Sequence, residues 1–340
     1  MKTYPTKYGD LKSIATAKTY PNGRLRSCML NGETRLATTI GEIVPQYRSA
    51  EFGERQKKYR SSLDFYDNGE IKSASLDRAA LLRTPLGPMK AELVTFYQDG
   101  TLNRIFPLNG LIDGFWSETN ERDLAEVLEI VLPGGSIRAK VISLHFYPSG
   151  AVKSITLWPG EVVTVNTPLG PVLCRTGLAF YENGAVRSVE PSRAIELETP
   201  VGPIMAYDPD IIGMHADQNS VQFSPNGELT AVSTIHSGII ASLPEGREYR
   251  IEPFERESYI DAAQWTTVPM TVVFTAEYVR LKAEKTYEFS LSDCTFSTFT
   301  RERVWQATCK DCPDDETCCK NGGPGVGDTG TCCGGGGCGG

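Results

Sequence analysis

Three absences in this 340-residue sequence narrow what the protein can do. No run of apolar residues approaches the eighteen or so that a membrane-spanning helix needs. No block of Lys and Arg stands out in a chain of net charge −8, which argues against a nucleic-acid partner, and no membrane partner is expected either. Residues 1–10 lack the apolar core of a secretion signal, so we expect a cytoplasmic protein.

Recognisable catalytic motifs are also missing. The sequence has only three His residues, His145, His215 and His236, and they are scattered. It contains no Ser-His-Asp order, zinc-protease motif, phosphate loop or dinucleotide fingerprint. The densest polar cluster could form a small metal or substrate site, or be a polar loop between repeats, and it consists of Asp208, Asp210, His215, Asp217 and Asn219.

What the sequence does contain is a recurring phrase. Residues 65–73 read FYDNGEIKS, residues 146–154 FYPSGAVKS and residues 180–188 FYENGAVRS. Looser copies surround Gly23, Gly100 and Gly227, and a truncated copy surrounds Gly9. Self-similarity of this kind predicts an array of small units, each too small to bury a core alone.

The phrase is typical of a β-hairpin. Strand-forming residues flank an Asn-Gly or Asp-Gly turn, and Pro21, Pro148 and Pro225 stand two residues before the Gly. Pro excludes a type I′ turn there, because that turn needs positive φ. We therefore expect three-residue loops with a Gly bulge. The residues two and five after the Gly are both apolar, so either both faces of the sheet are covered or the bulge resets the pleat.

A second phrase interleaves with the first. It reads TPLGP at residues 84–88 and 167–171 and TPVGP at residues 199–203. Pro residues punctuate turns, so we expect a second, alternating hairpin turn; a docking site for a partner is the other interpretation. The basic residues that follow the Gly of the first phrase could bind acidic groups or simply be solvated, and they are Lys12, Arg26, Lys72, Lys153 and Arg187.

The first phrase resembles the repeats of YwqK-type antitoxin proteins and, more distantly, MORN repeats, over about residues 1–235. The resemblance implies rows of β-hairpins that act as passive scaffolds or binding surfaces, and it implies no catalytic residues. This chain departs from both families in the irregular spacing of its repeats and in the TPLGP insertions.

The predicted fold is all-β: an elongated antiparallel β-hairpin repeat sheet over residues 1–240, a C-terminal β module at 241–305, and a Cys/Gly-rich tail at 306–340. One short helix is expected around Leu124, Val127, Leu128 and Val131, which have helical spacing. Ser117 or Thr119 would cap this helix, and residues 133–135, Pro-Gly-Gly, would end it.

The tail is the main candidate for chemistry. It carries seven of the ten Cys residues: Cys309, Cys312, Cys318, Cys319, Cys332, Cys333 and Cys338. The C-x-x-C pair at Cys309 and Cys312 lets two thiolates bind one tetrahedral metal ion. Almost no apolar side chain is present in the tail to order it by packing, whereas metal binding would supply folding energy.

Three interpretations of the tail compete. It could bind zinc or an iron–sulfur cluster in a reducing cytosol, although no familiar ferredoxin spacing is matched. It could instead be tied or crosslinked by disulfides. It could also be a flexible thiol segment that an enzyme modifies or that carries sulfur.

The sequence therefore predicts a non-enzymatic scaffold or interaction protein that has a protein partner and a metal-binding tail. The main rival is a redox or electron-transfer protein with an iron–sulfur cluster on the tail. A third hypothesis, an enzyme that uses the loop from Asp208 to Asn219, comes with no mechanism.

Overall fold

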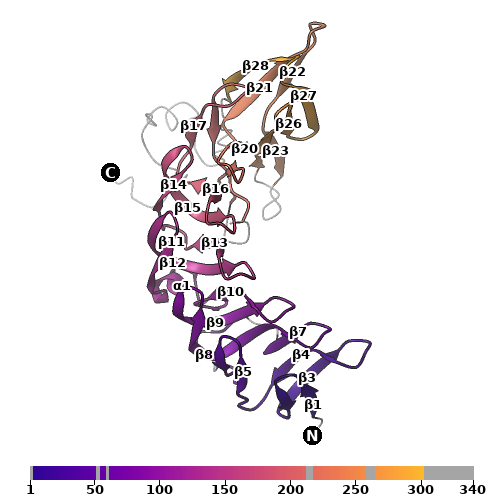
Figure 1. Cartoon of the computed structure of the whole chain (residues 1–340), viewed down its shortest axis with the longest axis vertical. Coiled ribbons are helices and arrows are strands. Elements are labelled where there is room, and N and C mark those ends of the chain that lie inside the picture. Colours follow the sequence, from indigo (N-terminus) through magenta and orange to yellow (C-terminus); the bar gives the residue numbers. More distant parts are fainter. Residues whose placement is uncertain (1–2, 51–53, 59–60, 212–216, 258–264, 302–340) are drawn as a thin grey trace, which may run out of the picture. The chain divides into compact units, whose positions relative to one another are not determined.

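The computed structural model describes residues 3–50, 54–58, 61–211, 217–257 and 265–301. Its regular elements in these ranges are β-strands and a single α-helix, α1 (Glu118–Leu124) (Figure 1). The predicted all-β class is confirmed. No helix in the described part of the chain is long and apolar enough to cross a bilayer.

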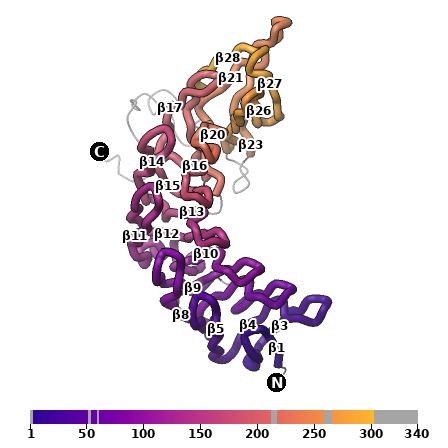
Figure 2. Tube along the Cα trace, viewed as in Figure 1, coloured from indigo at the N-terminus to yellow at the C-terminus, as the bar shows by residue number. Residues whose placement is uncertain are grey.

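Most strands belong to one antiparallel sheet of 17 strands, in which each hairpin pairs with the hairpin that follows it along the chain (Figure 2). Its strands are β3 (Ile14–Thr19), β4 (Leu25–Leu30), β7 (Leu63–Phe65), β8 (Ile71–Thr84), β9 (Gly87–Phe96), β10 (Leu102–Phe106), β11 (Val127–Leu132), β12 (Gly135–Phe146), β13 (Val152–Leu157), β14 (Val163–Thr167), β15 (Gly170–Phe180), β16 (Val186–Pro191), β19 (Val221–Phe223), β20 (Leu229–Thr234), β25 (Met270–Phe274), β26 (Tyr278–Lys282) and β27 (Thr286–Ser290).

The remaining strands form smaller antiparallel sheets. The two-stranded ones are β1 (Tyr4–Thr6) with β2 (Gly9–Leu11), β5 (Leu36–Thr38) with β6 (Gly41–Ile43), β17 (Ile195–Leu197) with β18 (Ile204–Ala206), and β23 (Phe254–Glu257) with β24 (Trp265–Val268). A three-stranded sheet places β21 (Ser237–Ser242) between β22 (Glu248–Ile251) and β28 (Thr295–Thr300).

The predicted boundary between residues 240 and 241 falls inside β21. Beyond that boundary, β25 pairs with β20 and so continues the 17-stranded sheet. By their contacts, the described residues up to Arg301 form one compact unit, and residues 302–340, which include nearly all of the predicted tail, lie outside the described residues.

The first phrase forms the predicted three-residue loop with a Gly bulge. In the loop at Gly69, for example, the Gly69 amide donates to the Tyr66 carbonyl at 3.0 Å, and the Tyr66 amide donates to the Glu70 carbonyl at 2.8 Å. We call the turns with this pair of bonds Gly-bulge turns. The Gly of each such turn has φ between +80° and +89°, and the glycines concerned are Gly23, Gly69, Gly100, Gly150, Gly184, Gly227 and Gly246. Gly246 lies beyond the last recognised copy of the phrase.

The second phrase forms a different, tighter hairpin turn, as predicted. In the turn from Thr84 to Gly87, the Thr84 hydroxyl donates to the Gly87 carbonyl at 2.7 Å, and these two residues also pair across the hairpin. Turns with this hydroxyl bond, which we call Thr turns, have a Gly φ between +98° and +121° and end at Gly9, Gly41, Gly87, Gly170 and Gly202. The truncated copy of the first phrase at Gly9 therefore forms a Thr turn, marked by the hydroxyl of Thr6, and not a Gly-bulge turn.

The bulge resets the pleat of the following strand. Phe65 pairs with Ile71 and Leu63 pairs with Ala74, so one extra residue of β8 is accommodated between the two pairs. Cross-strand partners point to the same face of a sheet. The residues two and five after the Gly, Ile71 and Ala74, consequently share one face, and both are buried.

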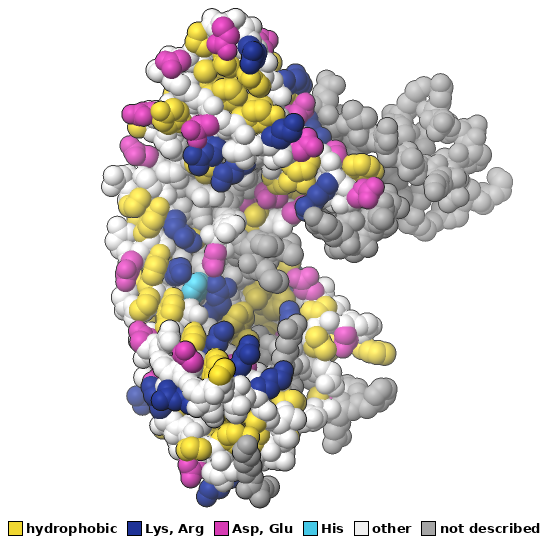
Figure 3. All heavy atoms as spheres, turned by 90° about the vertical axis from the view of Figure 1, so that its right-hand side faces the viewer, with side chains coloured by type: hydrophobic (Ala, Val, Ile, Leu, Met, Phe, Trp, Pro, Cys, Tyr) yellow, Lys and Arg dark blue, Asp and Glu magenta, His cyan; other side chains and the backbone are white. Residues whose placement is uncertain are grey.

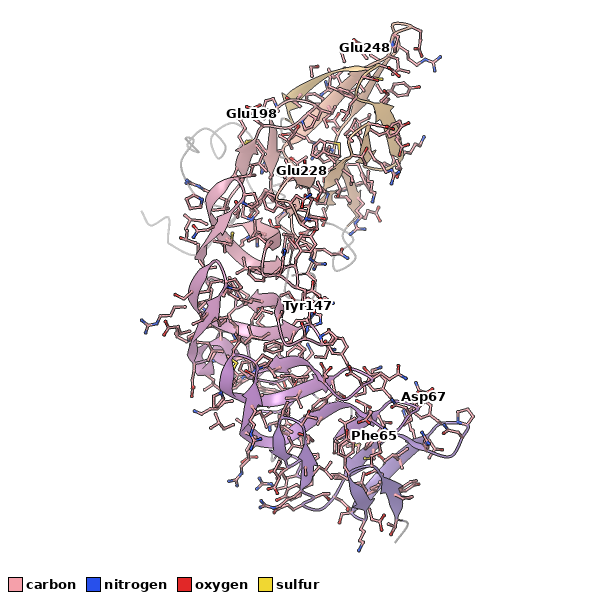
Figure 4. The ribbon with its side chains drawn as sticks, in the orientation of Figure 1. Phe65, Asp67, Tyr147, Glu198, Glu228 and Glu248 are labelled. Carbon is pink, nitrogen blue, oxygen red and sulfur yellow. The ribbon has the colours of Figure 1, made fainter. Side chains whose placement is uncertain are left out.

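A chain of Tyr hydroxyl bonds, which we call the Tyr ladder, links successive hairpins. The Tyr of each phrase donates to the carbonyl of the buried Phe in the next hairpin at 2.7–3.0 Å, and the pairs are Tyr20–Phe65, Tyr66–Phe96, Tyr97–Phe146, Tyr147–Phe180 and Tyr181–Phe223. Figure 4 labels Phe65 within the sheet and Asp67 at the loop tip beyond it. Ser224 stands at the next Tyr position, where the Tyr ladder ends.

The basic residue of the phrase stacks on the Tyr of its own turn. Lys72 lies 5.7 Å from the centre of the Tyr66 ring, and Lys153 lies 5.5 Å from that of Tyr147. Figure 3 shows hydrophobic and basic side chains alternating over the middle of one face of the molecule. The repeated F-Y and K/R positions thus hold neighbouring hairpins and turns together.

The predicted helix is partly wrong. Ser117 caps α1 as expected, but the helix ends at Leu124, and Val127–Leu132 form strand β11, which pairs with β12 across the turn at residues 133–134. Ile130 and Ile137 are buried partners in this hairpin. The β-branched residues of β11 and the Pro-Gly turn favour a strand over the helix that the spacing suggested.

Candidate functional site

One row of cross-strand partners crosses the sheet on the face opposite the buried Phe side chains. Between Asp64 and Gln222 it contains the residue just before each buried Phe of the phrase and the residue four after the Gly, which is Ser in most copies. These residues are Asp64, Ser73, Thr95, Arg104, His145, Ser154, Ala179, Ser188 and Gln222. Because cross-strand partners share a face, the row brings polar side chains from distant parts of the sequence together. We call it the polar row.

The centre of the polar row is the pair Arg104 and His145, joined by Asp217. The Arg104 guanidinium lies 2.8 Å from His145 Nδ1 and donates to Asp217 Oδ2 at 3.0 Å. A guanidinium can only donate hydrogen bonds, so His145 Nδ1 is the acceptor and the ring is neutral. Burial lowers the pKa of His145, and the positive charge of Arg104 lowers it further, against the opposing effect of Asp217.

Asp217 supplies the negative charge of this centre. Hydrogen bonds to its carboxylate, and then the positive charge of Arg104, hold the pKa of Asp217 well below its usual range despite partial burial. Arg187 donates to the Asp217 backbone carbonyl at 3.2 Å. Asp217 is therefore an ion-pair partner that neutralises Arg104 on the sheet.

The arrangement does not form a catalytic triad. Ser154 Oγ lies 3.5 Å and Asp217 Oδ2 3.7 Å from the same ring nitrogen, Nδ1 of His145. In a triad the nucleophile and the carboxylate bind opposite nitrogens, so that the ring can pass on a proton. The other nitrogen, Nε2, faces the Tyr97 hydroxyl at 3.4 Å, and that hydroxyl already donates to a backbone carbonyl.

A second cluster surrounds Glu190, which is fully buried. Its carboxylate accepts from the Ser220 amide at 2.8 Å and from the Asp208 amide at 3.3 Å. Arg175 lies 3.8 Å away. Burial raises the pKa of Glu190 to about 7, because the hydrogen bonds and Arg175 offset only part of the desolvation.

The predicted polar cluster is thereby divided. Asp217 joins Arg104 and His145, Asn219 donates to Ser188 at 2.9 Å, and Asp208 contributes its backbone amide to Glu190. Asp210 donates its amide to the Asp208 carboxylate at 2.9 Å. His215 lies outside the described residues, and His236 stacks on Tyr207 instead.

No group of His, Cys, Asp and Glu that could hold a metal ion occurs within the described ranges. The seven tail cysteines proposed as ligands, Cys309 to Cys338, lie outside those ranges. Of the other cysteines, Cys28 and Cys174 are buried, and desolvation raises the pKa of each thiol to about 12. These two are therefore inert structural thiols.

Sequence reasoning missed Arg104, Ser154 and Glu190. For Arg104 a signal existed, because it occupies the Ser position of the phrase in the copy around Gly100. Glu190 had no such signal, since a single Glu after the phrase does not reveal its burial. Comparison with known proteins found no matching family model, no matching curated protein and no matching solved structure.

Proposed function

We propose that this chain is a non-enzymatic scaffold and interaction protein whose Cys-rich tail binds a metal ion through thiolates. The observation that carries the first half is that the Tyr hydroxyls and the charged groups of the polar row are engaged with the backbone or with one another. The Tyr hydroxyls bind backbone carbonyls, and the Arg104–His145–Asp217 centre neutralises itself. Ser154 faces the ring nitrogen of His145 that Arg104 already occupies, so this His is not free to act as its general base.

A stack of hairpins suits such a role because each unit contacts its neighbours and together they present a continuous surface. The recurring Gly-bulge turns support kinship with hairpin-repeat scaffolds such as the MORN-like proteins, whereas the Thr turns of the second phrase are a departure from them. The interaction half is tested by purifying the full chain with its associated proteins from its native cells and rebuilding any complex from purified components. A defined complex is expected, and a chain that stays free at its native concentration contradicts the proposal.

The metal half rests on the sequence of the tail, where Cys309 and Cys312 are spaced for one tetrahedral ion. The test is elemental analysis with free-thiol counting on protein purified without oxygen. We expect a colourless protein with stoichiometric zinc. A brown, visibly absorbing protein would support the electron-transfer alternative, and a metal-free protein with oxidised tail cysteines would reject metal binding.

A further inference from the structure

The segment from Leu111 to Val127 exposes an unusual number of large apolar side chains. Phe115 is 93% exposed, and the others are between 37% and 51% exposed: Leu111, Ile112, Leu124 and Val127. Single exposed apolar residues are normal, but several within one short segment mark an interaction site. We call residues 111–117 the Phe115 loop.

The Phe115 loop is held in one conformation by its own hydrogen bonds. The Asp113 carboxylate accepts from the Phe115 amide at 2.8 Å and from the Trp116 amide at 2.9 Å. The Asp113 amide donates to the Trp116 carbonyl at 3.0 Å, which closes the turn. Phe115 is therefore presented by an ordered turn, and little conformational entropy is lost when a partner binds it.

A buried ionic cluster fixes the base of the loop. The Trp116 indole donates to Glu121 Oε2 at 2.8 Å, and Arg55 forms ion pairs with both Glu121 and Glu92. Burial pushes the pKa of Glu121 upward, but the bonds from Arg55 and Trp116 outweigh it and the pKa is lowered. Leu111 is tied to the segment at 54–58 by its amide, which donates to the Gln56 carbonyl at 2.9 Å.

The segment itself is acidic. Between residues 111 and 129 the exposed charged residues are all carboxylates: Asp113, Glu118, Asp123, Glu126 and Glu129. Lys90 pairs with Glu126 at 2.6 Å, and Arg138 lies across the hairpin from Glu129, so the unpaired negative charge next to the loop comes from Asp113, Glu118 and Asp123. The single basic residue in this stretch, Arg122, is half-buried and paired with Glu161 at 3.2 Å. A partner would meet an aromatic anchor inside a negative rim.

We propose that the Phe115 loop is the docking element for a protein partner that offers an apolar pocket surrounded by Lys and Arg. This inference rests on the proposed interaction function and names its site. An aromatic anchor in a desolvated pocket is a common source of binding energy, and opposite charges around it give specificity. The same negative rim disfavours an anionic membrane surface and a second copy of this loop, because like charges would face each other.

The test uses the full chain in its native cells with a photo-reactive benzoylphenylalanine at position 115. The matched control carries the same group at Leu81, an apolar residue of β8 that is 68% exposed and lies outside the loop. We expect a discrete protein adduct from position 115 that the control at position 81 does not give. The captured protein is then purified, and its affinity is measured for wild type, Phe115→Ala and Leu81→Ala.

Phe115→Ala should weaken this binding at least about thirtyfold, and Leu81→Ala should leave it within about twofold. Added salt should weaken the wild-type complex, because the rim is charged. Unchanged melting of Phe115→Ala is expected from the exposure of the ring and excludes misfolding. The inference would be overturned by an adduct to lipid or to a second copy of the chain, or by the absence of any adduct. Equal affinities of Phe115→Ala and Leu81→Ala would also overturn it. If the complex rebuilt from purified components has the same affinity with Phe115→Ala as with the wild type, only this docking site is rejected. If no complex is found at all, the interaction function itself is rejected.

Discussion

The hydroxyl of Tyr97 donates a hydrogen bond of 2.8 Å to the backbone carbonyl of Phe146, although the two residues are 49 positions apart in the sequence. The same bond recurs between the hairpins on either side, where Tyr66 binds Phe96 and Tyr147 binds Phe180. The repeated F-Y pair therefore has two separate tasks: Phe fills the core of its own hairpin, and Tyr ties that hairpin to the next one.

Removing one step of the Tyr ladder should destabilise the sheet measurably. Tyr147→Phe keeps the ring that Lys153 covers but leaves the carbonyl of the buried Phe180 without its donor. We expect a loss of about 1 kcal/mol in the free energy of unfolding, measured in urea. Tyr278→Phe, in β26 and outside the Tyr ladder, is the control. Equal losses of unfolding free energy in the two variants would show that the Tyr ladder does not stabilise the sheet.

Two glycines with nearly the same backbone should respond differently to Ala. Gly184 and Gly23 have φ of +84° and +80°, so both substitutions carry a similar backbone strain of about 1–2 kcal/mol. A Cβ at Gly184 would lie 2.5 Å from Cγ of Pro133, whereas a Cβ at Gly23 meets nothing within 4 Å. We expect Gly184→Ala to be the more destabilising by about 1–3 kcal/mol in urea unfolding. Adding Pro133→Ala should recover part of that excess, and a strictly additive double mutant would rule out the contact.

The buried Glu190 should make stability depend on pH. Its pKa is about 7 in the folded protein and near 4.3 in an unfolded chain, so the folded state binds more protons between these values. Its contribution to stability is therefore present below about pH 4 and is lost as the pH rises to about 7, on the order of 1 kcal/mol per pH unit. Glu190→Gln should lose this dependence, and the difference between wild type and variant should grow from pH 5 to pH 8 in urea unfolding. Parallel stability curves for the two proteins would contradict the burial of a titrating carboxyl group.

Deletion of residues 309–340 should abolish metal uptake and leave the melting of the β-sheet body nearly unchanged. The hydrophobic core of the described residues runs from Leu11 to Phe289, and the tail has almost no apolar side chain to add to it. The measurement is metal content by elemental analysis together with thermal unfolding by circular dichroism. Unfolding of the body on deletion, or metal that stays bound, would show that the tail is part of the fold.

The sequence by itself determined the turns. An Asn or Asp directly before Gly, together with the Pro that some copies carry two residues before the Gly, is compatible with one compact loop geometry. Gly69 and Gly184 adopt the positive φ that this loop requires. Such turns depend on the backbone of a few neighbouring residues, which is why local patterns predict them. The all-β class followed from repeating them.

Tertiary structure decided what local patterns could not. Residues 124–131 have helical spacing, yet residues 127–132 become a strand because pairing with β12 buries Ile130 against Ile137. Arg104 and Asp217 meet across 113 positions only after β12, β13, β15 and β16, which lie between β10 and β19 in the sheet, have set its register. Side-chain partners at such separations follow from the pairing of whole strands, which no short stretch of sequence encodes.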